Sequence, residues 1–446
     1  MKTYEARREQ ALAAFHGGVA IIPSATTIPR NNDTEYEFRQ NSDFYYLTGF
    51  DEPDAVLVLA PEHDEHRAIL FLRERDRATE IWNGRRLGVD AAVETIGVDI
   101  AYPIGSLAQE LPRYLCNVET LYYTLGNSEN DACVRAALGD ARAMTRRAGF
   151  APDTIADPSP ALHALRQIKS AHEIAQMRRS AEITAQGHIA AMRATRPGLH
   201  EYEIEAVLEY EFHRAGAQRT AYESIVAGGD NATILHYREN RDRLAEGTLL
   251  LVDAACEYNY YAADVTRTWP VNGRFSAEQR AIYDVVLAAQ QAAIETLRPG
   301  QPQKAFHYAA VRVITEGLIE LGLLRGSVDE AIERETYREY YMHGTGHWLG
   351  MDVHDVGRYR DLSDTPVTLE PGMVTTVEPG VYVQRDAACD ERFRGIGVRI
   401  EDDLLITESG SENLTAMIPK SIDELEAIIG TCELEFSGQR VSSGAI

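Results

Sequence analysis

The sequence has 446 residues, which is too long for one ordinary hydrophobic core and predicts two domains. Its composition, 44% hydrophobic and 25% charged, is typical of a globular protein. Its formal net charge of −25 argues against nucleic acid and anionic membranes as partners, because no run of Lys or Arg offsets the repulsion. No apolar segment approaches the ~18 residues that a membrane-spanning helix needs.

The N-terminus and the cysteines bear on location. Residues 1–10 are polar and contain no apolar segment of the signal-peptide type, so we expect a cytoplasmic protein. The 5 cysteines include no CxxC pair, which fits reduced thiols and excludes a zinc ribbon.

The first part of the chain, from Gly17 to about Ile168, alternates short β-rich runs with helical ones. This alternation predicts an α/β domain with a mostly covered sheet. The β-rich runs are residues 19–22, 44–47, 55–59, 68–72 and 121–125. The polar and aromatic segment Asn31–Phe50 is expected to pack or bind at the domain edge. We place the domain boundary near residue 170, which predicts domains 1–170 and 171–446.

The second domain begins with long amphipathic helices in two successive pairs. Helices are predicted over residues 174–192 and 201–215, then over residues 276–297 and 304–321, and the first helix of each pair stops at an Arg-Pro-Gly sequence. We interpret this as an α+β domain with duplicated helix-helix-sheet halves, related by a pseudo-twofold axis, whose helices cover one curved antiparallel sheet. Coincidence is the alternative, since Pro-Gly is a common helix terminator.

Between the two helix pairs, Leu249–Thr268 reads as a β-hairpin that carries two aspartates. If the turn is centred between Tyr258 and Asn259, Asp253 and Asp264 are direct antiparallel partners on one face. Two carboxylates ~5 Å apart repel by roughly 3 kcal/mol at an effective dielectric of about 20. A positive charge is therefore expected between them.

The alternative places both aspartates on a solvated edge, where screening makes the pair inexpensive. It fits poorly with Leu251 and Ala255, which alternation puts on the same face as Asp253.

A histidine-rich segment, Met342–Asp355, follows the second helix pair. His343 and His347 have the i, i+4 spacing of a helical metal pair, but the glycines between them disfavour a helix. No Glu follows His343, so the segment is not the HExxH motif of zinc proteases. We expect a Gly-rich loop that brings the imidazoles, including His354, close to a sheet.

Two further acidic positions lie on predicted strands. Glu378 ends a β-branched strand just before Pro379-Gly380. In residues 395–407, alternation puts Arg399, Glu401 and Asp403 on one face. Taken alone, a mid-strand Glu is more typical of a sheet edge or barrel mouth than of a metal site.

The combination indicates metal chemistry. Two aspartates from one half can meet one histidine and two glutamates from the other half. Such an oxygen-rich set suits two divalent cations of the Mn class rather than a thiolate zinc site, with carboxylates bridging ions ~3.5 to 4 Å apart. A hydroxide that bridges the ions would be a nucleophile for hydrolysis at neutral pH.

At these residues the sequence resembles the metal-dependent Xaa-Pro aminopeptidases (aminopeptidase P), within the pita-bread family of metallopeptidases. The resemblance covers nearly the whole chain. The segments that carry it are Gln40–Phe50, Glu80–Gly88, Val252–Thr268, His343–Gly357, Thr376–Tyr382 and Gly395–Asp403. One departure is Gly344-Thr345-Gly346, where close relatives vary in the middle residues.

The resemblance implies an aminopeptidase that releases the N-terminal residue from peptides with proline in second position, by attack of a metal-bridging hydroxide. It implies two divalent ions, Mn²⁺ with Zn²⁺ or Co²⁺ as alternatives. Their implied ligands are Asp253, Asp264, His347, Glu378 and Glu401. Glu378 would also manage the proton of the attacking hydroxide.

The resemblance also implies the substrate contacts. His236 and His354 match histidines that bind substrate and polarise the scissile carbonyl, and the proline pocket would be lined by His343, Arg399 and Tyr382. Trp82 matches a residue that in tetrameric relatives reaches a neighbouring subunit's site. A homotetramer or homodimer is therefore expected, with the N-terminal domain serving oligomerisation and the edge of the substrate cleft.

Three alternatives remain at this point. A prolidase would cut the same bond in dipeptides only. A catalytically silent binding module on this fold, or a metal-free hydrolase of the creatinase type, would be expected to have lost ligands, whereas all five implied ligands are present.

Thr266, two residues after Asp264, is expected to support the ligands from behind.

Overall fold

The computed structural model describes residues 2–432 and divides into two compact units, residues 1–166 and 167–446. Most of the C-terminal tail after Gly430, in which the sequence indicates no function, lies outside the described residues. Within residues 2–432, no helix combines the length and apolar character that crossing a bilayer requires.

The first unit is built on a mixed six-stranded sheet in the order β6-β5-β4-β1-β7-β8. Pairing is antiparallel from β1 to β4 and from β4 to β5, and parallel at the other three junctions. The strands are β1 (Gly18–Pro23), β4 (Val56–Leu59), β5 (Ala68–Leu72), β6 (Ile100–Pro103), β7 (Thr120–Tyr122) and β8 (Thr154–Ala156). Helices α5 (Leu107–Tyr114) and α6 (Ser128–Thr145) add Leu111 and Leu138 to the core, as an α/β domain requires.

One predicted strand is wrong, because residues 44–47 lie in helix α2 (Ser42–Thr48). The side chain of Asn41 accepts the N–H of Phe44 at 3.0 Å and caps the helix N-terminus. Gly49, at φ +62°, ends it in the left-handed conformation. These local caps outweigh the β propensity of the aromatic run.

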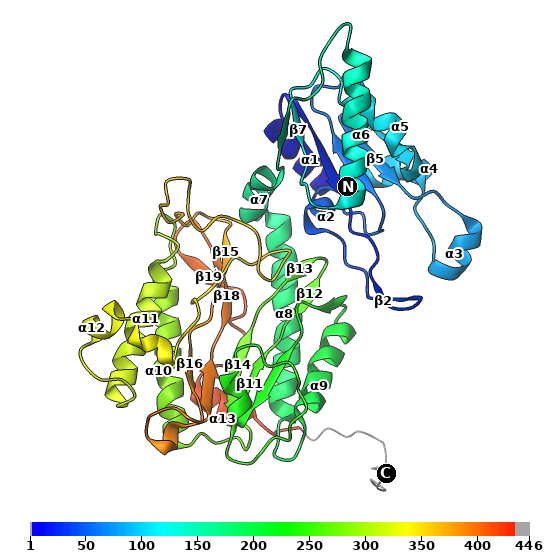
Figure 1. Cartoon of the computed structure of the whole chain (residues 1–446). Helices are drawn as coiled ribbons and strands as arrows, with labels where there is room; N and C mark the ends of the chain where they lie inside the picture. The colour runs from blue at the N-terminus through cyan, green and yellow to red at the C-terminus, as the bar shows by residue number, and fades with distance from the viewer. Residues whose placement is uncertain (1, 433–446) are drawn as a thin grey trace. The chain divides into compact units, whose positions relative to one another are not determined.

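In the second unit, helices flank a central layer of strands (Figure 1). Helix α8 (Ala171–Ala194) packs against α9 (Glu201–Arg214), and α10 (Ala277–Thr296) packs against α11 (Ala305–Glu320). Capping boxes start both α8, at Ser170, and α10, at Ser276. The four predicted helices are present, with ends that differ by a few residues.

The strands of this unit form four antiparallel groups instead of the single continuous sheet expected from the sequence. The orders are β10-β11-β14, β13-β12-β9, β15-β18-β19 and β16-β17. The strands are β9 (Arg219–Thr220), β10 (Ile225–Gly228), β11 (Leu249–Asp253), β12 (Cys256–Tyr258), β13 (Tyr261–Ala262), β14 (Thr266–Pro270), β15 (Val374–Val377), β16 (Gly380–Val383), β17 (Ile396–Arg399), β18 (Asp402–Ile406) and β19 (Ser411–Asn413). The pairing ladders break where Asp264, Glu378 and Glu401 leave the strands.

The hairpin has a different register from the predicted one. Asp253 pairs with Thr266, because the turn is centred between Asn259 and Tyr260, which have φ values of 49° and 68°. Asp264 is therefore the diagonal neighbour of Asp253 on the same face. The solvated-edge alternative is also wrong, since Asp253 is 9% exposed and Asp264 is 5% exposed.

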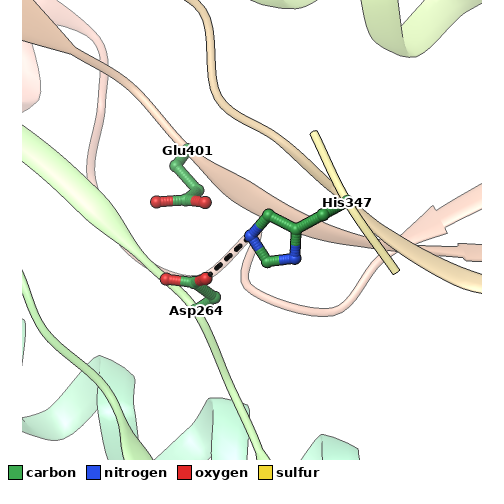
Figure 2. A group of neighbouring side chains, drawn as sticks. All are labelled: Asp264, His347 and Glu401. Carbon is green, nitrogen blue, oxygen red and sulfur yellow. Dashed lines mark ion pairs between the residues drawn. The ribbon is translucent and has the colours of Figure 1, made fainter. Parts of the chain in front are cut away.

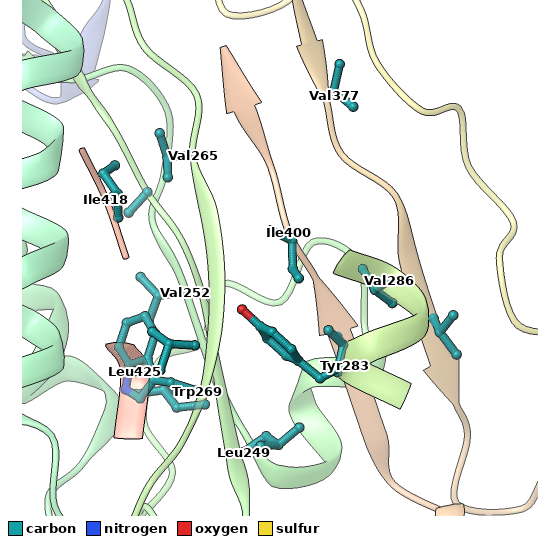
Figure 3. Close-up of a cluster of buried hydrophobic side chains, with 14 of the residues drawn as sticks. Leu249, Val252, Val265, Trp269, Tyr283, Val286, Val377, Ile400, Ile418 and Leu425 are labelled. Carbon is teal, nitrogen blue, oxygen red and sulfur yellow. The ribbon is translucent and has the colours of Figure 1, made fainter. Parts of the chain in front are cut away.

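A single hydrophobic core joins the hairpin to the helices and to the later strands (Figure 3). Leu249, Val252 and Trp269 of the hairpin belong to the same buried cluster as Tyr283 of α10 and Ile400. This packing joins the hairpin to the strands around residues 378 and 401, which is what positions the site.

Each helix pair has a glycine at its closest approach, which generates a stability prediction. A Cβ at Gly317 of α11 would overlap with Val285 of α10. We expect Gly317→Ala to destabilise the protein by about 1–3 kcal/mol, since overpacking outweighs the ~1 kcal/mol gain in helix propensity. Chemical denaturation measures the change.

The matched control is Gly139 of α6, which is exposed and where an added Cβ would meet no atom within 4 Å. Gly139→Ala should be neutral or stabilising by up to ~1 kcal/mol. Equal effects at the two positions would contradict the packing argument.

Candidate metal centre

A polar pocket of about 320 Å³ lies in the second unit, at the breaks in the strand ladders. It is lined by Leu235, His236, Asp253, Asp264, His343, Gly344, Gly346, His347, His354, Glu378, Arg399 and Glu401. The structure thus brings together all but two of the residues that the sequence proposes for the site. The two exceptions are Tyr382, which lies behind the lining, and Trp82.

Strand ends position the acidic side chains. Asp253 is the last residue of β11, Glu378 follows β15, and Glu401 lies between β17 and β18. The N–H of Glu401 donates to the carbonyl of Thr266 at 3.0 Å, which joins β14 to the later strands beside the pocket. The carboxylates are therefore presented where one strand ends and the chain crosses to its next pairing partner.

Three of these residues are close enough to share one metal ion. Ligand atoms of Asp264, His347 and Glu401 all lie within 4.8 Å of one another, the only such group within residues 2–432 (Figure 2). His347 Nε2 is 3.3 Å from Asp264 Oδ2. His347 Nδ1 lies 3.0 Å from the Trp348 carbonyl, an arrangement that leaves Nε2 as the donor for a metal.

The pKa values show how much negative charge is concentrated here. Burial, together with Asp264, Glu378 and Asp253, raises the pKa of Glu401 well above its ordinary value. Burial likewise raises the pKa of Glu378 to about 7.

The pKa of His347, the single histidine among these acids, is also raised, but by its charged neighbours and not by burial. Burial alone would lower the pKa of His347, but the hydrogen bond and charge of Asp264 raise it to about 9. Four crowded carboxylates and one imidazole are a donor set that divalent cations would neutralise, so the residues fit a metal centre.

Asp253 is hydrogen-bonded to residues outside the group of Asp264, His347 and Glu401. Its Oδ2 accepts from Arg399 Nη2 at 2.6 Å, and its Oδ1 accepts from the Tyr222 hydroxyl at 2.6 Å. Arg399 Nε donates to Thr266 Oγ1 at 3.0 Å, and Thr266 donates to Glu401 at 2.7 Å. Arg399 therefore neutralises Asp253 but makes no ion pair with Asp264 within residues 2–432, so the positive charge expected between the two aspartates stays a prediction, and Thr266 supports Glu401.

Sequence reasoning missed Tyr222, which lies in an irregular segment and carries no motif or periodicity. It also left the role of Thr345 open. Thr345 Oγ1 lies 2.8 Å from His307 Nδ1 and 2.5 Å from the Tyr341 hydroxyl, and its carbonyl accepts the N–H of Glu378 at 2.7 Å. The departure at residues 344–346 thus ties the histidine loop to α11 and to Glu378.

The other three histidines surround the pocket. His343 Nε2 lies 2.8 Å from the Tyr382 hydroxyl. Burial and the nearby Arg399 lower the pKa of His343 to about 3, so this ring is neutral and its 3.7 Å approach to Glu378 is not an ion pair. His236 and His354 are exposed at the pocket, and the ring of His354 stands edge-on to His347 at 4.4 Å.

Trp82 lies in the first unit, on helix α3 (Arg77–Asn83), which has no buried residue. Its side chain is 86% exposed, in contrast to Asp264 and Glu401, which are 5% and 2% exposed. The Trp82 side chain is therefore available to contact another molecule.

Comparisons with known proteins agree with this geometry. Residues 175–408 match the model of metallopeptidase family M24, and residues 4–134 match the aminopeptidase P N-terminal domain. The Xaa-Pro aminopeptidase of Escherichia coli is 47% identical over 95% of this chain and 96% of its own, and that of Haemophilus influenzae is 48% identical over 96% of each.

Solved structures match over the same extent. The aminopeptidase PepP of Pseudomonas aeruginosa superimposes with a TM-score of 0.93 at 47% identity, covering 96% of this chain and 97% of that one. Zn-substituted E. coli aminopeptidase P in complex with product gives a TM-score of 0.92 at 46% identity, covering 96% and 97%. With its pita-bread C-terminal domain and separate N-terminal domain, the chain belongs to metallopeptidase family M24.

Proposed function

We propose that this protein is a metal-dependent aminopeptidase that releases the N-terminal residue from peptides with proline in second position. The observation that carries the proposal is the buried Asp264, His347 and Glu401 group, which lines a pocket with two further carboxylates and three further histidines. The E. coli and H. influenzae relatives, which are Xaa-Pro aminopeptidases, support the substrate class.

The proposed ligands are Asp253, Asp264, His347, Glu378 and Glu401, which would hold two divalent cations. Four carboxylates and one imidazole favour Mn²⁺, with Zn²⁺ or Co²⁺ as alternatives. When bound, such ions polarise the scissile carbonyl and make water a nucleophile at neutral pH.

The chain's own residues would handle the proton and the substrate. Glu378, whose Oε1 lies 3.8 Å from His347 Nε2, would accept the proton of the attacking water and return it later in the reaction. His236 and His354, exposed at the pocket, would donate hydrogen bonds to the peptide carbonyl. The neutral His343, held by Tyr382 beside Arg399, would form the wall against which the proline ring packs.

We also propose that the second unit is a duplication. The pairs α8–α9 and α10–α11 each precede antiparallel strands, β10-β11-β14 in the first half and β15-β18-β19 in the second. Asp253 and Asp264 would then come from one half, and His347, Glu378 and Glu401 from the other.

For the first unit we propose a role in oligomerisation and at the edge of the substrate cleft, within a homotetramer or homodimer. The exposed Trp82 supports this role. A cytoplasmic location remains a prediction; Cys116, Cys133, Cys256 and Cys389, which form no disulfide within residues 2–432, are consistent with it.

The substrate prediction separates the proposal from the prolidase alternative. Purified protein should hydrolyse a tripeptide with proline second faster than the corresponding Xaa-Pro dipeptide, because the pocket is proposed to accept a chain that continues past proline. Stripping the metal with a chelator should abolish turnover, and restoring each divalent ion in turn identifies the one that supports it. Faster cleavage of the dipeptide would favour a prolidase.

The ligand prediction concerns Asp264. Asp264→Ala should lose bound metal and lower kcat by on the order of 10³-fold or more, because it removes a ligand and leaves His347 without its partner. Metal analysis and kinetics measure both effects. Asp284→Asn, an exposed substitution on α10, is the control and should keep both the bound metal and the wild-type kcat. Full activity of Asp264→Ala without stoichiometric metal would contradict the mechanism.

The oligomer prediction concerns Trp82. Trp82→Ala should lower kcat/KM by about tenfold, or ~1.4 kcal/mol of transition-state stabilisation, without changing Tm, because the side chain is exposed. Co-refolding Trp82→Ala subunits with inactive Asp264→Ala subunits should restore activity if Trp82 acts on a neighbouring subunit's site. A monomer by sedimentation, or no complementation in mixed oligomers, would refute the intersubunit role.

A further inference from the structure

A buried ion pair that the proposed mechanism does not use lies close to the histidine-rich segment. Lys169 Nζ is 3.0 Å from Asp355 Oδ2, and both side chains are 1% exposed. Lys169 lies just before α8, and Asp355 directly follows His354 in sequence. The pair therefore joins two segments that are distant in the chain, at the residue next to a proposed catalytic histidine.

The segment Trp348–Asp355 is a compact loop that reverses the chain direction, and is called the turn below. The N–H of Asp355 donates to the carbonyl of Trp348 at 2.9 Å, and the N–H of Gly350 donates to the carbonyl of Asp352 at 3.2 Å. The carbonyl of Gly350 accepts from the N–H of Ala262 at 2.9 Å, two residues before Asp264. The turn is thus attached on one side to the aspartate hairpin.

On its other side, the turn is attached through the ion pair. The N–H of Lys169 donates to the carbonyl of Gly372 at 2.8 Å, which holds the base of the lysine against the segment leading into β15. Gly350 packs directly on the pair: a Cβ there would overlap with the Asp355 carboxylate and lie 2.9 Å from Lys169 Cε. No larger residue fits at position 350 without moving the pair.

His354 depends on this turn for its position. Its side chain makes no hydrogen bond within residues 2–432, and its ring contact is the edge-on approach to His347 at 4.4 Å. The imidazole is exposed at the pocket, so neither side-chain hydrogen bonds nor dense packing orient it. Its location is set by the backbone of the turn.

We propose that the Lys169–Asp355 ion pair is a positioning element for His354, which fixes the turn so that the imidazole lies where it can donate to the scissile carbonyl. The inference rests on the proposed function, in which His354 contacts the substrate. Replacing a buried ion pair with apolar groups of similar volume is often neutral or stabilising, so stability alone does not explain the pair. Its directional contacts define the turn.

The first test is a kinetic cycle with a tripeptide that has proline second. Asp355→Asn should lower kcat by about 10- to 100-fold with less than about threefold change in KM, as expected for a small displacement of a group that acts in the transition state. In a His354→Ala background, Asp355→Asn should lower kcat by less than about threefold more, because both changes remove the same contribution. If the two substitutions lowered kcat by factors that multiply in the double variant, the proposal would be wrong.

The second test separates positioning from stability. Asp355→Asn leaves Lys169 buried without its charged partner and should lower Tm, whereas the double variant Lys169→Met with Asp355→Leu removes both charges and should recover Tm. We expect kcat of the double variant to stay low and its crystal structure to show a displaced His354. Recovery of kcat together with Tm would show that the pair is only structural.

The matched control is another buried acid of the same unit. Glu257 pairs with Arg219 at 2.6 Å, is 3% exposed in its side chain, and does not line the pocket. Glu257→Gln should lower Tm but leave kcat within about twofold, and its effect should be the same with and without His354.

The two proposals fail in different ways. An inactive wild-type protein, or a fully active His354→Ala variant, would refute the proposed function or the role of His354 in it. An active wild type that loses turnover with His354→Ala but keeps it with Asp355→Asn would refute the positioning role alone.

Discussion

The mutual repulsion of buried carboxylates is the constraint on which the second unit depends. Asp253, Asp264, Glu378 and Glu401 line one pocket, and each is brought there by a strand that ends or breaks at that point. Charges buried this closely are unfavourable unless cations or protons offset them. The surrounding core supplies the packing that holds them in place, and the carboxylates form the oxygen-rich donor set proposed to bind divalent metal.

The successive acidic residues 401–403 lie in opposite electrostatic environments. Asp402 faces away from the pocket and accepts from Arg267 Nη2 at 2.7 Å and from Lys420 Nζ at 2.5 Å. Burial would raise its pKa, but these two cations lower it to about 2. Glu401 and Asp403, on the opposite face, have raised pKa values because burial and neighbouring carboxylates dominate. Strand alternation therefore places neighbouring acids in two different electrostatic environments.

The histidine loop is organised by contacts behind the pocket rather than inside it. Thr345 binds the loop to His307 and Tyr341, and Gly346 lies so close to the Thr376 carbonyl that a Cβ would overlap with it. In this segment Gly346 therefore allows the close approach to Thr376, and Thr345 anchors the loop through its hydroxyl. The Lys169–Asp355 pair extends this supporting layer to the turn that carries His354.

Sequence alone determined the features that depend on local physics. Amphipathic periodicity predicted the long helices, and strand alternation placed Arg399 and Glu401 on one face. Tertiary structure decided what depends on contacts between distant segments. Two wrong predictions had local causes, because the turn at Asn259-Tyr260 set the hairpin register and the caps of α2 outweighed the β propensity of residues 44–47. Tyr222, by contrast, reached Asp253 from a distant segment without any sequence signal. Short-range propensities differ too little to decide such cases, so the packing and hydrogen bonding of the whole unit decide them.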